Sequence, residues 1–153
     1  LRALMPCEKP WGRARRKTPR GDPYLLYRCP SHHTQIYAQA QQTFGLGLLI
    51  AEDQSPALAR DAFARARRDL QGASCQPTLN RARVWLASCP QRRGVALIVR
   101  PNKKGDRDVV MIVGRTDPLY AMLGQAPPGE AKAQEAGREP EEERGGGAAR
   151  EAK

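Results

Sequence analysis

The sequence predicts an α+β fold in which a small mixed β-sheet packs with two or three helices. Three patterns predict it. Residues 35–41 alternate polar and apolar side chains, as a half-buried strand does. Residues 57–70 repeat apolar side chains at helical spacing. Residues 95–99 form an unbroken apolar run, typical of a strand covered on both faces.

The first half of the domain predicts a three-stranded antiparallel meander. Strands are expected at 24–27, 35–41 and 48–51, because turn-forming residues at 29–31 and 44–47 separate these short runs. Tight connections of this kind join antiparallel neighbours.

The second half predicts helices and a crossover strand. Ser55 is a good N-cap and Gly72 a good stop for a helix over 56–71. A second helix is expected over 78–89, and the strand at 95–99 then joins the same sheet by a crossover. A short helix is expected over 117–123, whereas 109–113 fits a strand or a helix.

Composition divides the 153 residues into three parts. Residues 1–23 hold seven basic residues and four prolines, and we expect an arm that orders against a partner. Residues 24–124 form the α+β domain, which we expect to bind RNA. Residues 125–153 contain no large apolar side chain, so a disordered charged tail is expected there.

Positive charge is the strongest functional signal. The chain carries a formal charge of +10, and residues 1–124 alone hold 21 basic and nine acidic residues. An excess of this size costs self-repulsion unless a polyanion neutralises it. Nucleic acid is therefore the leading partner class, and a basic soluble protein without such a partner is the alternative.

The sequence predicts neither a metal site nor disulfides. Its four cysteines show no CxxC pair, and the only local cluster, Cys29 with His32 and His33, lacks a second half. Free thiols in a reducing compartment are expected instead.

Motifs for catalysis are missing as well. The sequence has no glycine-rich phosphate loop, no nucleophile elbow and no HExxH motif. No apolar run is long enough for a membrane helix. We therefore expect a binding protein rather than an enzyme, with no cofactor, no small-molecule substrate and no membrane partner.

Basic residues at turns and strand ends are the candidate RNA contacts. Besides the arm, they include Arg28 with the two histidines, and Arg100 with Lys103 and Lys104. Tyr24, Tyr27 and Tyr37 lie among them, either to stack on unpaired bases or simply as sheet residues.

One stretch resembles a known family. Residues 24–39, which read YLLYRCPSHHTQIYAQ, are similar to the opening of the 5S rRNA-binding large-subunit ribosomal protein, the eighteenth in the standard list. Residues 83–89 and 93–100 are similar to a later helix and buried strand of that family. The likeness covers about residues 20–123. The Arg100-Pro101 and Lys103-Lys104-Gly105-Asp106 segments depart from bacterial members and are more like diverged mitochondrial ones.

The resemblance implies a structural protein of the mitochondrial large ribosomal subunit. It would bind 5S rRNA, or equivalent rRNA, at the central protuberance, beside neighbouring ribosomal proteins. Its hairpin motif is matched by Arg28, His32, His33, Tyr37 and Gln39. Its basic arm is matched by Arg13, Arg15, Arg16 and Arg20, with Lys17 beside them.

Two other functions stay open. One is a different organellar ribosomal protein, such as a relative of small-subunit protein eleven. The other is a basic accessory subunit of a mitochondrial assembly. Arginine at 20 of 26 basic positions and a first residue other than Met fit an organellar protein trimmed of its transit peptide, with chloroplast or cytoplasm as alternatives.

Overall fold

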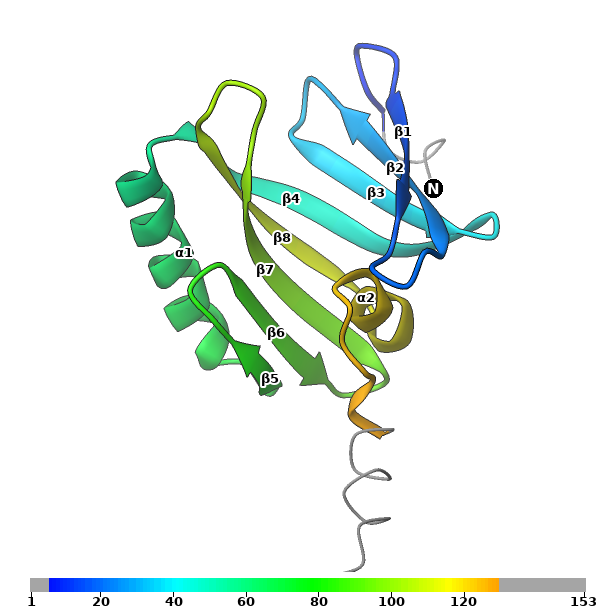
Figure 1. Ribbon diagram of the computed structural model, residues 1–153, viewed down its shortest axis with the longest axis vertical. Helices are drawn as coiled ribbons and strands as arrows, with labels where there is room; N and C mark the ends of the chain where they lie inside the picture. Colours follow the sequence, from blue (N-terminus) through cyan, green and yellow to red (C-terminus); the bar gives the residue numbers. More distant parts are fainter. Residues whose placement is uncertain (1–5, 130–153) are drawn as a thin grey trace, which may run out of the picture.

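One antiparallel sheet of eight strands organises the chain (Figure 1). The computed structural model describes residues 6–129. Its strands are β1 (Gly12–Lys17), β2 (Pro23–Cys29), β3 (Thr34–Gln39), β4 (Gln42–Gln54), β5 (Gln76–Asn80), β6 (Val84–Cys89), β7 (Arg93–Pro101) and β8 (Arg107–Arg115). Its helices are α1 (Pro56–Gln71) and α2 (Thr116–Met122). No helix within the described residues is long and apolar enough to cross a membrane.

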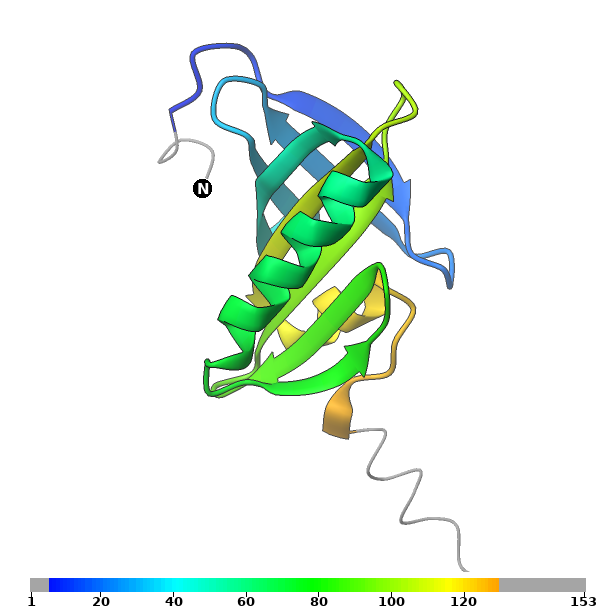
Figure 2. The same ribbon diagram turned by 90° about the vertical axis from the view of Figure 1, so that its left-hand side faces the viewer.

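The sheet consists of two four-stranded meanders joined side by side. The strand order is β1-β2-β3-β4-β8-β7-β6-β5, and every neighbouring pair is antiparallel. After β4, helix α1 runs diagonally across one face of the sheet (Figure 2), so that β5 starts at the far edge. The chain then returns strand by strand until β8 pairs with β4.

This architecture corrects the predicted fold class. The sheet is large and wholly antiparallel, not a small mixed sheet, and the protein is closer to all-β than to α+β. The helix expected over 78–89 is wrong, because that stretch comprises the end of β5, the turn after it and all of β6. The open choice at 109–113 resolves to strand β8. The predicted turn at 44–47 lies inside β4.

The helix over 56–71 is confirmed, including its first residues. The Ser55 hydroxyl accepts a hydrogen bond from the Leu58 N–H, and Gly72 follows the last turn. Buried Ala59 and Phe63 pack on Trp85 and Leu97 of the sheet. Helix α1 thus covers one face of the central strands and accounts for the apolar residues that β7 has on that face.

Helix α2 packs against the opposite face. Its Leu119 and Tyr120 are at most 1% exposed and contact Leu86, Ala96 and Val110. The hydroxyl groups of Tyr120 and Thr78 lie 2.6 Å apart. We call the two sides of the sheet the α1 face and the α2 face.

The junction of β4 with β8 requires a glycine. A Cβ atom on Gly114 would overlap the carbonyl oxygen of Phe44. Residue 114 pairs with Gly45, so two glycines lie opposite each other where the meanders meet. This lets the two backbones approach more closely than side chains would allow.

The ends of the described region bear on the predicted arm and tail. Within the predicted arm 1–23, residues 12–17 form edge strand β1, which pairs with β2 from Gly12↔Arg28 to Lys17↔Pro23. Residues 1–5, and residues 130–153 of the predicted tail, lie outside the described residues.

All four cysteines are paired, which corrects the expected free thiols. Cys7 bonds Cys29, and Cys75 bonds Cys89. The first disulfide ties the segment before β1 to the end of β2, and the second ties the α1–β5 connection to the end of β6. The partners are 22 and 14 residues apart, so no local spacing revealed them.

We expect the Gly114→Ala substitution to lower the free energy of unfolding by more than about 2 kcal/mol, because the new methyl group meets fixed backbone. Urea denaturation followed by circular dichroism measures this. Gly12→Ala is the control, since its nearest atom would lie 3.7 Å away. Equal stabilities of the two variants would contradict the tight β4–β8 junction.

Replacing both Cys75 and Cys89 by Ala should lower the free energy of unfolding by about 3 kcal/mol, the loop-entropy value for a 15-residue loop. The measurement is urea denaturation of the variant beside the oxidised protein. Detection of free thiols by a thiol reagent in the untreated folded protein would contradict the pairing.

Candidate nucleic-acid interface

Three arginines from separate strands gather on the α2 face. Arg16 lies on β1, Arg28 on β2 and Arg100 on β7, and we call them the arginine cluster. Arg28 shares its face with Leu26, two residues earlier, and Arg100 shares its face with Ile98, because strand residues alternate sides. Leu26 and Ile98 both belong to the core beneath α2.

The charges of the cluster act on one another. Desolvation and then the nearby charge of Arg100 lower the pKa of Arg28, and Arg16 adds to this effect. Tyr37 and Asp108 act in the opposite direction. Repulsion between like charges is therefore built into this surface, and a bound anion would relieve it.

Tyr37 is a buried residue next to the arginine cluster. It is 3% exposed, and its hydroxyl donates a 2.6 Å hydrogen bond to Oε1 of Gln35, which is 4% exposed. Its ring centroid lies 6.4 Å from that of Tyr24 and 6.1 Å from that of Phe44. A ring enclosed in this way cannot stack on a nucleotide base, so its predicted role as an RNA contact is corrected to one of supporting the surface.

Burial raises the pKa of Tyr37, whereas the charge of Arg100 and a hydrogen bond from it act the other way. Burial likewise raises the pKa of the Tyr24 hydroxyl, against the charges of Arg16 and Arg100. The charges of the cluster therefore act on two phenols whose neutral form is favoured by burial.

A cavity of about 200 Å³ opens between the cluster and the β2–β3 turn. Arg28 and Arg100 line it, but so do Glu52 and Asp108. The formal charges of these two arginines and two carboxylates cancel, so the cavity itself is not a pocket of positive charge.

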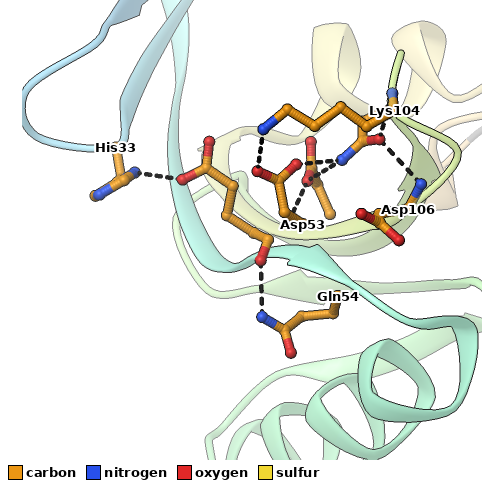
Figure 3. Close-up of polar contacts among 8 residues, drawn as sticks. His33, Asp53, Gln54, Lys104 and Asp106 are labelled. Atoms are coloured by element: carbon orange, nitrogen blue, oxygen red, sulfur yellow. Dashed lines mark hydrogen bonds and ion pairs between the residues drawn. The ribbon is translucent and has the colours of Figure 1, made fainter.

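Two predicted contacts are instead paired with carboxylates (Figure 3). His33 Nδ1 lies 3.1 Å from Glu52 Oε2, and Lys104 Nζ lies 2.7 Å from Asp53 Oδ2. The hydrogen bond and charge of Asp53 raise the pKa of Lys104. Both side chains are exposed, but a phosphate would have to compete with a carboxylate for each.

The other predicted contacts spread over the molecule. On β1, Arg13, Arg15 and Lys17 alternate with Arg16 and therefore lie on the opposite side of that edge strand. Exposed positive charge along an edge strand also prevents pairing with other chains. The remaining four are Arg20 and His32 in turns, Gln39 at the end of β3, and Lys103 in the β7–β8 turn.

Gln35 and Asp108 belong to this site although the sequence analysis missed them. Gln35 pairs with Arg28, and Asp108 pairs with Arg100. The Asp108 carboxylate accepts hydrogen bonds from the Asp53 N–H and the Asn102 amide, at 3.1 and 3.2 Å. The polar–apolar alternation of β3 was a usable signal for Gln35. Asp108 had none, because its neighbours come from distant segments.

The part of the chain that the structure describes contains no cluster of three or more His, Cys, Asp or Glu side chains able to hold a metal ion. Searches of protein families, curated proteins and solved structures find no match to this chain.

Stability should fall as the pH rises above 10, and Tyr37→Phe should reduce that fall. The raised pKa of Tyr37 means that its stabilising contribution is fully present below the unfolded-state pKa, near 10, and is lost as the pH rises through the folded-state value. Urea midpoints between pH 9 and 11.5 measure it, with wild-type protein as the reference. Identical pH profiles would contradict the buried phenol.

Proposed function

We propose that this chain is a binding protein without catalytic chemistry, and that its arginine cluster holds the phosphate backbone of RNA. One observation carries the proposal: Arg16, Arg28 and Arg100 come from three strands to one face of the sheet. Within the described residues, none of the three has a carboxylate ion-pair partner.

Arginine suits this task. A guanidinium keeps its charge at every physiological pH and presents several N–H donors in a plane that matches phosphate oxygens. Each arginine that meets a phosphate releases condensed counterions, so binding is salt-dependent and largely independent of base sequence. The buried Tyr37 and Gln35 hold the surface beneath rigid, which lowers the entropic cost of binding.

A ribosomal role is the specific form of this proposal that the resemblance of residues 24–39 supports. Arg28, within that stretch, belongs to the cluster. The fold implied by the family, three strands followed by a helix, a strand and a helix, is not the one observed, so support for the ribosomal role comes from the motif alone. Ribosomal assembly and a mitochondrial location stay predictions.

The two disulfides favour a second candidate function. Disulfides persist mainly in oxidising compartments and outside the cell. With no free cysteine in the chain, we propose as the alternative that the same cluster binds a sulfated or phosphorylated polymer in such a compartment. The chemistry of recognition is the same, and only the polymer differs.

The double variant Arg28→Gln/Arg100→Gln should weaken binding to single-stranded RNA at least tenfold and reduce the slope of log K against log salt by about 1 to 2. Fluorescence anisotropy at several salt concentrations measures both. Arg65→Gln/Arg68→Gln is the matched control, because it removes the same charge from α1.

Competition with heparin in the same assay separates the two candidates. If RNA displaces bound heparin at equal charge concentration, the result supports the RNA proposal. If heparin displaces bound RNA instead, the result supports the second candidate. Equal losses in the two double variants would reject the cluster as the site.

A further inference from the structure

We propose a second anion site on the α1 face, in a cavity of about 460 Å³ lined by Arg60, Arg83 and Arg107. Its ligand class is a compact, soluble polyanion that carries phosphate groups, such as a pyrophosphate. This site lies outside the arginine cluster and does not depend on the function proposed for that cluster.

Each arginine comes from a different part of the chain. Arg60 lies near the start of α1, and Arg83 lies in the turn between β5 and β6. Arg107 begins β8, opposite Gln54 of β4 and Pro101 of β7. Arg107 shares its face with Val109, which packs beneath α1, so its side chain is on the α1 face.

The backbone fixes the turn that carries Arg83. The Val99 N–H donates a 2.8 Å hydrogen bond to the carbonyl oxygen of Arg83, and the Arg81 N–H donates one of 2.9 Å to the carbonyl oxygen of Val84. Val99 itself lines the cavity. The turn that carries Arg83 is therefore held against β7 by a backbone hydrogen bond of the fold itself.

No acidic residue lines this cavity. Its remaining lining residues are Pro56, Ala57, Ala82 and Val99, all apolar. Within residues 6–129, the three guanidinium groups form no hydrogen bond or ion pair. The first turn of α1 also lacks an acidic residue. Three unpaired cations around one hollow repel one another, and an anion is the group that would resolve this.

The contrast with the arginine cluster is informative. The cavity beside the cluster contains Glu52 and Asp108 as well as two arginines, whereas this one contains arginines alone. Arg107 and Asp108 are consecutive on β8 and therefore lie on opposite faces of the sheet. The two sites are separated by the sheet itself, so each can be removed without the other.

Size and polarity select the ligand. A volume of about 460 Å³ is within the range of small-molecule pockets. A cavity lined by apolar residues and three arginines accommodates a small organic phosphate or a pyrophosphate group better than a bare halide. Phosphate oxygens match the planar guanidinium donors in pairs, which a spherical chloride ion from the buffer cannot do.

The test is isothermal titration of the full chain with sodium pyrophosphate at a fixed ionic strength of about 0.15 M. We expect one site per chain. Arg60→Gln/Arg83→Gln should weaken it at least tenfold, and Arg65→Gln/Arg68→Gln, with the same loss of charge, should change it by less than twofold. Arg28→Gln/Arg100→Gln should also leave it within twofold.

Two outcomes would overturn the proposal: no saturable binding to wild-type protein, or equal weakening in the pocket and control variants. Circular dichroism confirms that each variant is folded. Should the double variant not fold, the single exposed substitution Arg60→Gln takes its place, with an expected loss of at least threefold. Arg68→Gln is then its control. RNA affinity of the pocket variant, measured in parallel, separates failure of this site from failure of the arginine cluster.

Discussion

The pairing of β4 with β8 is the contact on which the rest of the fold depends. It is the one place in the described sheet where the first meander meets the second. Every later feature follows from it: α1 must cross the sheet to deliver β5 to the far edge, and β8 must return beside β4. Glycines 45 and 114 face each other at this junction, because the Phe44 carbonyl leaves no room for a side chain.

Central strands between two helices explain the composition of the core. Leu97 and Val109 contribute to the layer beneath α1, whereas Ala96 and Val110 contribute to the layer beneath α2. Consecutive apolar residues are stable there because both faces are covered. The edge strand β1 is covered by neither helix, and it carries the exposed basic residues that keep it from pairing with other chains.

The alternation of strand residues also creates two chemically different faces. Arg107 and Asp108 are neighbours in the chain, yet they contribute to separate sites on opposite sides of the sheet. Positive charge is thereby divided between an open surface over Tyr37 and a hollow beside α1. Such a division suits one extended and one compact anion, and the two disulfides stabilise the segments that flank both meanders.

Local patterns in the sequence determined the helix over 56–71 and the strands near 24–27, 35–41 and 95–99. Ser55, Pro56 and Gly72 act on their own neighbours, so their meaning does not depend on the fold. The short apolar run at 109–113 could not be assigned, because local spacing suits a strand or a helix until the neighbours are known. Residues 78–89 were misread for the same reason, since only pairing with β7 makes β6 a strand.

The basic composition predicts a polyanion as partner, and Arg16, Arg28 and Arg100 are among the residues expected to contact it. Tertiary structure alone decided that these three share a surface, that Tyr37 is buried beneath them, and that Lys104 is paired with Asp53. It also decided the two disulfides and the hollow that joins Arg60, Arg83 and Arg107. The physical reason is distance along the chain: each of these contacts joins residues that only the packed sheet and helices bring together.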